Sequence, residues 1–124
     1  LDCGLYVVAT PIGNLADITL RALEVLKGVD KIACEDTRVT KRLLSRYGIG
    51  TYMIPYHDHN AESVRISLIE EIRGGAALAL VSDAGMPAIS DPGYKLVKEC
   101  YLNNIRVTHA PGPSSIINGL IYLR

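Results

Sequence analysis

Three segments rich in glycine, proline and serine carry the residue types in this sequence that best suit ligand binding. They are residues 10–14 (TPIGN), 82–93 (SDAGMPAISDPG) and 110–115 (APGPSS), and each follows an apolar run. Glycine and small residues allow a ligand to approach the backbone closely, while Ile12 and Met86 can pack against a flat ring. Any one of these segments alone is equally consistent with a tight turn. The three together favour a site for a nucleoside-like ligand.

A second chemical feature is a concentration of positive charge in one predicted helix. At 3.6 residues per turn, four basic residues fall within an arc of about 140°, and apolar residues occupy the opposite side. The four basic residues, among thirteen Lys and Arg in the whole chain, are Arg38, Lys41, Arg42 and Arg46. Such a stripe can contact phosphates, and the alternative is a solvated helix face.

Other titratable residues give weaker indications. Asp36 follows Glu35 at the end of a short apolar run, where an acid can hold ribose hydroxyls or, more often, cap a helix. His57 and His59 flank an aspartate but lack a third metal ligand nearby, which favours a polar surface turn over a metal site. Cys34 and Cys100 lie on apolar faces and are expected in the core.

The elements that position these residues follow from the apolar periodicity. Apolar runs predict five strands, at residues 5–9, 31–34, 52–55, 76–81 and 105–108. Helical stripes predict a helix after each of the first four strands, and a last helix begins near Ser114. This alternation predicts an α/β fold, a doubly wound five-stranded parallel sheet with helices on both faces. In such a sheet the three ligand segments leave from one edge.

Turn and capping residues predict where the helices begin and end. Asp17 is expected to cap the first helix, and Gly48 to end the second. Asp91 is expected to cap the fourth helix, with Pro92 at its first helical position, and Asn104 to lie where that helix ends.

Composition limits the class of protein. The chain has 124 residues, 21% of them charged, with a formal net charge of zero, which predicts one domain without an overall basic charge. The longest apolar run falls short of the roughly 18 residues of a membrane span, and no charged start precedes an apolar run as in a signal peptide. Three widely spaced cysteines fit a reducing compartment. We therefore expect a cytoplasmic protein. The apolar end at residues 120–124 suggests that a further domain follows.

Four motifs together resemble a known family. They are residues 5–15 (LYVVATPIGNL), 34–38 (CEDTR), 82–93 (SDAGMPAISDPG) and 111–115 (PGPSS). In this order they resemble the amino-terminal domain of the ribosomal RNA small subunit methyltransferase I family, which is of the tetrapyrrole methylase type. The resemblance covers residues 1–124 and implies a two-domain enzyme whose carboxyl-terminal domain this chain lacks.

The resemblance implies S-adenosylmethionine-dependent methylation of the ribose 2′-hydroxyl of a cytidine in small-subunit (16S) ribosomal RNA, commonly by a homodimer. It implies that the cofactor, S-adenosyl-L-methionine, lies in a cleft between the two domains. The implied cofactor contacts in this chain are Pro11, Ile12, Asp83, Ala84, Gly85, Met86, Gly112, Pro113, Ser114 and Ser115. The absence of Lys and Arg from these segments suits a cationic sulfonium.

Two roles follow for the remaining candidates. Asp36 is the candidate catalytic base, because the family sheet order 3-2-4-1-5 places its strand beside the fourth. The basic residues Arg38, Lys41, Arg42 and Arg46 are candidate contacts to RNA phosphates. Two alternatives stay open. Enzymes of the same fold methylate corrin precursors or diphthine intermediates, and the isolated domain could act as a dimerisation or RNA-docking module without turnover.

Overall fold

The structure is a computed structural model, and it describes residues 1–11, 15–82 and 92–110. Five parallel strands form one sheet in the order β3-β2-β4-β1-β5. Their bounds are β1 Gly4–Ala9, β2 Lys31–Cys34, β3 Met53–Pro55, β4 Ala77–Ser82 and β5 Val107–Ala110. Both the fold class and the sheet order expected from the sequence are confirmed.

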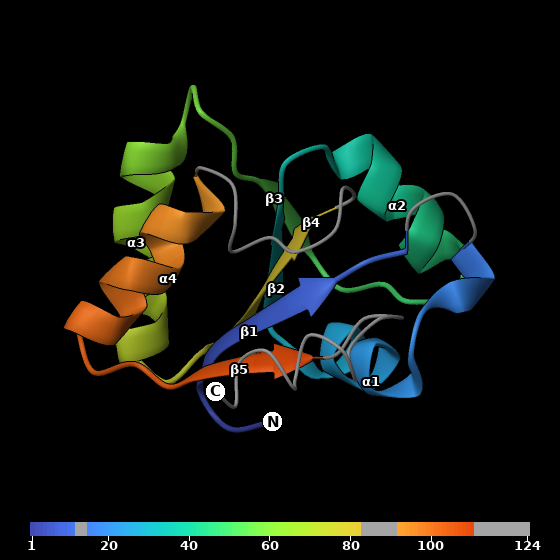
Figure 1. The fold of residues 1–124 in the computed structure, drawn as a ribbon, viewed down its shortest axis with the longest axis horizontal. Helices are drawn as coiled ribbons and strands as arrows, with labels where there is room; N and C mark the ends of the chain where they lie inside the picture. Colours follow the sequence, from blue (N-terminus) through green and yellow to red (C-terminus); the bar gives the residue numbers. More distant parts are fainter. Residues whose placement is uncertain (12–14, 83–91, 111–124) are drawn as a thin grey trace, which may run out of the picture.

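Four α-helices and one short 3-10 helix connect the described strands. They are η1 Leu15–Asp17, α1 Leu20–Gly28, α2 Thr37–Arg46, α3 Ala61–Arg73 and α4 Gly93–Leu102. Helices α1 and α2 cover one face of the sheet, and α3 and α4 cover the other (Figure 1). This arrangement gives the doubly wound layers that the alternating pattern predicts.

Strand β1 has no polar residue because both of its faces are covered. In β1, Tyr6 and Val8 pack with α1 and α2, while Leu5 and Val7 pack with α3 and α4. All six residues of β1 are buried. Side chains alternate between the two faces of a strand, so a strand with two buried faces has no polar positions.

The first helix begins later than the sequence predicts. Thr19 is its N-cap, and the Thr19 hydroxyl oxygen accepts a hydrogen bond of 3.1 Å from the Ala22 backbone N–H. The expectation that Asp17 caps this helix is wrong, because Asp17 ends the preceding 3-10 turn η1 and is exposed. A threonine three residues before the first buried position of α1 offers the same capping oxygen.

Two boundaries around α4 also differ from the sequence prediction. Pro92 is the N-cap residue and not the first helical residue, and the Asp91 cap lies outside the described residues. Strand β5 begins at Val107, two residues later than expected. Asn104 takes a left-handed conformation (φ 57°), and the Ile105 N–H still bonds to the Cys100 carbonyl at 2.8 Å. Ile105 therefore completes the end of α4 instead of starting the strand.

The other helix ends agree with the sequence. Gly48, which follows α2, has φ +66°, a conformation that glycine adopts without strain. Cys100, which the sequence places in the core, is buried in α4 together with Leu96. Within the described ranges, no helix combines the length and apolar character needed to cross a membrane.

Candidate functional site

The carboxyl ends of four strands meet along one edge of the sheet. Ala9 at the end of β1 pairs with Ser82 at the end of β4, and Val8 pairs with Ala110 at the end of β5. On the other side of β4, Cys34 of β2 pairs with Val81. The prediction that the three ligand segments start from one edge is therefore confirmed for the points where they leave the strands.

Most of the cofactor contacts implied by the sequence resemblance lie outside the described residues. These are Ile12, Asp83, Ala84, Gly85, Met86, Gly112, Pro113, Ser114 and Ser115. Pro11 is described and buried, and it lines a pocket directly beyond the end of β1.

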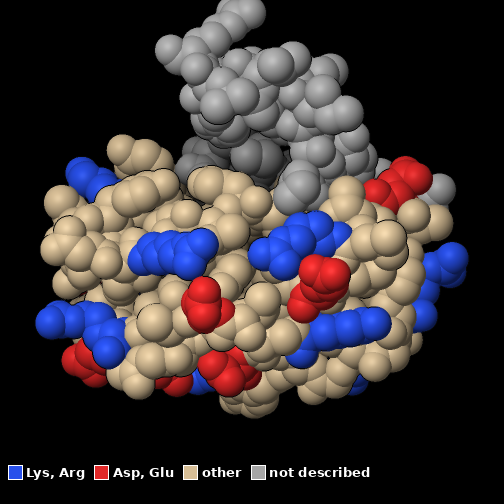
Figure 2. Space-filling view, turned by 90° about the horizontal axis from the view of Figure 1, so that it is seen from below, with Lys and Arg blue, Asp and Glu red and all other residues tan. Residues whose placement is uncertain are grey.

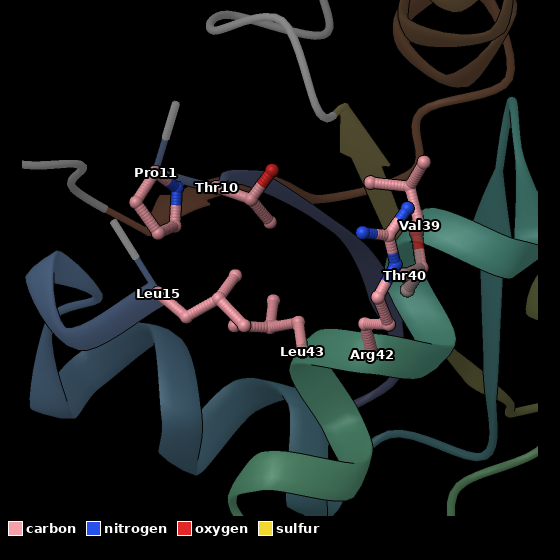
Figure 3. A pocket seen from close by; sticks show the side chains of 7 residues that line it. All are labelled: Thr10, Pro11, Leu15, Val39, Thr40, Arg42 and Leu43. Atoms are coloured by element: carbon pink, nitrogen blue, oxygen red, sulfur yellow. The ribbon is translucent and has the colours of Figure 1, made fainter. Parts of the chain in front are cut away.

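This pocket has a volume of about 310 Å³ and lies between the end of β1 and helix α2 (Figure 3). It is the β1–α2 pocket below. Its described lining residues are Thr10, Pro11, Leu15, Val39, Thr40, Arg42 and Leu43. Leu15 of η1 and Leu43 of α2 point toward each other across the pocket in Figure 3. The volume is at the lower end of the range for small-ligand sites, about 300–1,000 Å³.

The pocket lining combines apolar walls with a few polar groups. Leu43 is buried, and the hydroxyl-bearing residues Thr10 and Thr40 are only 8% and 5% exposed. Arg42 is the one charged side chain among the described lining residues. In Figure 3, Arg42 extends from α2 at the side of the pocket opposite Pro11. The pocket therefore suits a ligand with a flat or apolar body and a negative group at one side.

A tyrosine hydrogen bond connects the two sides of the pocket. The Tyr47 hydroxyl, just after α2, donates a hydrogen bond of 2.7 Å to the Leu15 backbone oxygen. This bond joins η1 to the carboxyl end of α2 and so helps to hold the Leu15 wall in place. The two partners are 32 residues apart, and no local pattern links them.

The basic residues of α2 form an exposed face, as the helical periodicity predicts. Arg38, Lys41, Arg42 and Arg46 are all exposed, whereas Leu43 and Leu44 are buried. We call these four residues the α2 basic face. Arg38 is paired with Asp36 at 3.3 Å. Within the described ranges, the other three have no carboxylate within 4.0 Å. The free positive charge is therefore centred on Lys41, Arg42 and Arg46.

On another face of the molecule, positive and negative charges are interspersed. Figure 2 shows the face on which β5 and α1 lie nearest, and there Lys and Arg side chains alternate with Asp and Glu. Arg106 pairs with Asp2 at 3.4 Å, and Arg21 pairs with Glu24 at 3.2 Å. The α2 basic face thus differs from this face of mixed charge, although the chain as a whole has no net charge.

Asp36 is the N-cap of α2, which confirms the capping interpretation of the sequence. One carboxylate oxygen accepts a 2.9 Å hydrogen bond from the Arg38 backbone N–H, and both oxygens accept bonds of 3.3 Å from the Arg38 guanidinium. These hydrogen bonds lower the pKa of Asp36 below its usual value. The carboxylate is ionised at neutral pH, and its basicity is reduced.

The structure also places the two histidines and the two apolar-face cysteines singled out in the sequence. The His57 and His59 rings meet edge to face, with centroids 5.7 Å apart. Within the described part of the chain, no three His, Cys, Asp or Glu residues are grouped as metal ligands. Cys34 and Cys100 are buried, and burial raises the pKa of Cys100 to about 12. The interpretation of both cysteines as core residues is confirmed.

Comparisons with known proteins agree with this architecture. The family model for tetrapyrrole (corrin/porphyrin) methylases matches residues 4–123. A ribosomal RNA small subunit methyltransferase I from Mesorhizobium japonicum is 56% identical over 120 residues, which cover 97% of this chain and 41% of the relative. The protein of the same name from Escherichia coli O157:H7 is 53% identical over 116 residues, covering 94% of this chain and 41% of the relative.

Solved structures share the fold at low sequence identity. A uroporphyrin-III-C-methyltransferase from Thermus thermophilus superposes with a TM-score of 0.69 at 21% identity, covering 89% of this chain and 47% of that chain. A diphthine synthase gives a TM-score of 0.68 at 17% identity, covering 87% and 43%. The chain spans about two fifths of the length of the curated relatives described above.

Proposed function

Since this chain belongs to the tetrapyrrole (corrin/porphyrin) methylase family, we propose that it forms part of an S-adenosylmethionine-dependent ribosomal RNA methyltransferase. The reaction is methylation of the ribose 2′-hydroxyl of a cytidine in small-subunit ribosomal RNA. The observation that carries this proposal is the 56% identity to a ribosomal RNA small subunit methyltransferase I over nearly the whole chain. The likeness to the corrin-type and diphthine enzymes is much lower, at 17–21%.

The proposed cofactor site is the edge where the carboxyl ends of β1, β4 and β5 meet. Parallel α/β sheets bind ligands beyond this edge, and here three glycine-rich segments start from adjacent strands. The proposed contacts are those that the resemblance implies: Pro11, Ile12, residues 83–86 and residues 112–115. The cofactor supplies a methyl group on a cationic sulfonium. Segments without Lys or Arg avoid repulsion with that charge.

The proposed RNA contacts are on the α2 basic face. Three of its four cations have no acidic neighbour among the described residues, so they are available to phosphates. The face begins two residues after Asp36, which follows the end of β2 at the same sheet edge. An RNA strand on α2 therefore approaches the edge where the cofactor is proposed to bind.

Asp36 is proposed to receive the proton of the reacting hydroxyl. In this step the ribose oxygen attacks the methyl carbon, the carbon–sulfur bond breaks and the hydroxyl proton goes to a base. The Arg38 contact keeps Asp36 ionised but also makes it a weaker base. The role of Asp36 is thus to orient the hydroxyl and accept its proton as the new bond forms. Asp36→Asn should then lower the single-turnover rate more than it weakens RNA binding.

The experiment is a methyl-transfer assay with the full-length protein. Assembled small subunits and naked small-subunit RNA are each incubated with S-adenosylmethionine labelled on the methyl group. Label should enter the RNA of the subunits, and RNA with 2′-deoxycytidine at the labelled position should accept none. Label that enters a tetrapyrrole precursor but not RNA would favour the corrin-type reaction. RNA binding without any transfer would favour a docking module.

Two properties of the whole protein complete the proposal. It acts in the cytoplasm, where small subunits are assembled, and it acts as a homodimer. Sedimentation of the full-length protein at several concentrations tests the second point. A single species with the mass of one chain would exclude the dimer.

A further inference from the structure

We infer that the β1–α2 pocket receives one unstacked nucleoside of the substrate RNA, and that Arg42 binds a phosphate next to it. The remaining cations of the α2 basic face would then follow the RNA backbone away from the pocket. This inference rests on the proposed RNA substrate. It assigns the body of the pocket to the RNA, with Pro11, a proposed cofactor contact, at the border between the two ligands.

The shape and lining of the pocket match the chemistry of a nucleoside. Leu15, Val39 and Leu43 supply aliphatic surface on two sides, from η1 and from α2. A base has apolar faces and a polar edge, and a ribose has hydroxyls on an apolar ring. Thr10 and Thr40 are the hydroxyl-bearing residues of the lining, and a hydroxyl can both donate and accept hydrogen bonds.

The charge of the pocket favours an anionic ligand. Arg42 is its one charged residue among those described, and no carboxylate within the described ranges neutralises it. A guanidinium repels the sulfonium of S-adenosylmethionine and attracts a phosphate. Arg42 alone would be enough to bind a small anion. Lys41 and Arg46 extend the positive surface along the same exposed helix face, which suits a polyanion that continues beyond the pocket.

The pocket also sets a requirement on the RNA. A base that is stacked in a duplex cannot enter a pocket beside a strand end, so the nucleoside must be single-stranded or turned out of its stack. Single-stranded RNA is recognised in this way, with bases splayed into pockets and the backbone held by cations.

The experiment measures the fluorescence of an unstacked base on the full-length protein. The probe is a short single-stranded RNA that contains one pyrrolocytosine, titrated in the presence of S-adenosylhomocysteine. Binding should change the fluorescence of the probe as the base leaves its neighbours. An identical RNA held in a duplex should give a much smaller change.

Three variants separate the pocket from the rest of the basic face. Arg42→Gln should weaken binding about tenfold, and it should reduce the fluorescence change at saturating protein. Val39→Phe fills the pocket and should abolish that change while most of the binding through Lys41 and Arg46 remains. Arg46→Gln is the matched control. It removes a cation from the same face but outside the pocket. Binding should weaken only about two- to threefold, and the fluorescence change at saturating protein should stay complete.

Several results would overturn the inference. One is a full fluorescence change in both pocket variants when each is saturated. Another is calorimetry in which Val39→Phe, with a normal melting curve, loses S-adenosylhomocysteine but retains the RNA signal, since the pocket would then belong to the cofactor. A wild-type protein that does not bind the probe also overturns it. The proposed function fails separately, if the wild-type protein gives the fluorescence change but transfers no methyl group to small subunits.

Discussion

The charge pairing on α2 makes a quantitative prediction about salt. Four cations lie on its exposed face, but Asp36 already pairs with Arg38 at 3.3 Å. Each cation that neutralises a phosphate of single-stranded RNA contributes about 0.7 to the slope of log affinity against log salt. Lys41, Arg42 and Arg46 should therefore contribute about 2 in total, and Arg38 should contribute little.

The perturbation is the replacement of those three residues by glutamine in the full-length protein. The slope for binding to naked small-subunit RNA should become shallower by about 2. Over a change from about 50 to about 200 mM salt, the wild-type protein should lose roughly 20-fold more affinity than the triple variant. Filter binding or fluorescence anisotropy at four or more salt concentrations gives both slopes. All three side chains are exposed, so the variant should fold normally.

The single variant Arg38→Gln provides the matched control. Its slope should stay close to that of the wild-type protein, because Arg38 already has a counter-charge. An unchanged slope in the triple variant would mean that the α2 basic face is a solvated helix surface. The slope is also measured for the single variant Arg42→Gln. If Arg38→Gln and Arg42→Gln made the slope shallower by the same amount, the distinction between paired and free cations would be refuted.

Three further predictions concern the local structure around the site. Thr19→Ala removes the N-cap of α1 and should cost about 1 kcal/mol of unfolding free energy in urea, whereas Asp17→Ala should change it by less than about 0.5 kcal/mol. Equal losses of unfolding free energy in the two variants would contradict the assignment of Thr19, and not Asp17, as the cap. Tyr47→Phe removes the 2.7 Å bond to the Leu15 oxygen and should cost about 1 kcal/mol, measured in the same way. No loss would mean that water replaces the hydroxyl without penalty. The pKa of Asp36 is lowered on folding, so its ionised form contributes stability above its unfolded pKa that is lost as pH falls through the folded value. In Asp36→Asn, the unfolding free energy should therefore fall less steeply than in the wild-type protein as the pH drops below about 4. If the two curves of unfolding free energy against pH were parallel, Asp36 would make no such contribution.

The sequence was most informative where burial determines residue type. The run at residues 76–81 has no polar position because α1 and α2 cover one face of β4 and α3 and α4 cover the other. A strand of that kind can be recognised from sequence alone. The exposed face of α2 could also be predicted, because a period of 3.6 residues separates its cations from Leu43 and Leu44.

Features that depend on contacts between distant residues could not be predicted. The β1–α2 pocket combines Leu15 with Val39, which are brought together only by the crossover from β1 to α2. The start of β5 was misplaced because a left-handed Asn104 lets Ile105 bond back to α4. The pairing of Arg38 with Asp36 divides a stripe that looks uniform in sequence, and it depends on the capping conformation of Asp36.

The identity of the methylated nucleoside tests the central proposal most directly. Small subunits treated with the full-length protein and S-adenosylmethionine are digested to nucleosides, which are then separated and weighed by mass spectrometry. The proposed function predicts one new species, cytidine carrying a methyl group on its ribose, at up to one per subunit. A methyl group on a base, or no methylated nucleoside beyond the untreated control, would contradict it.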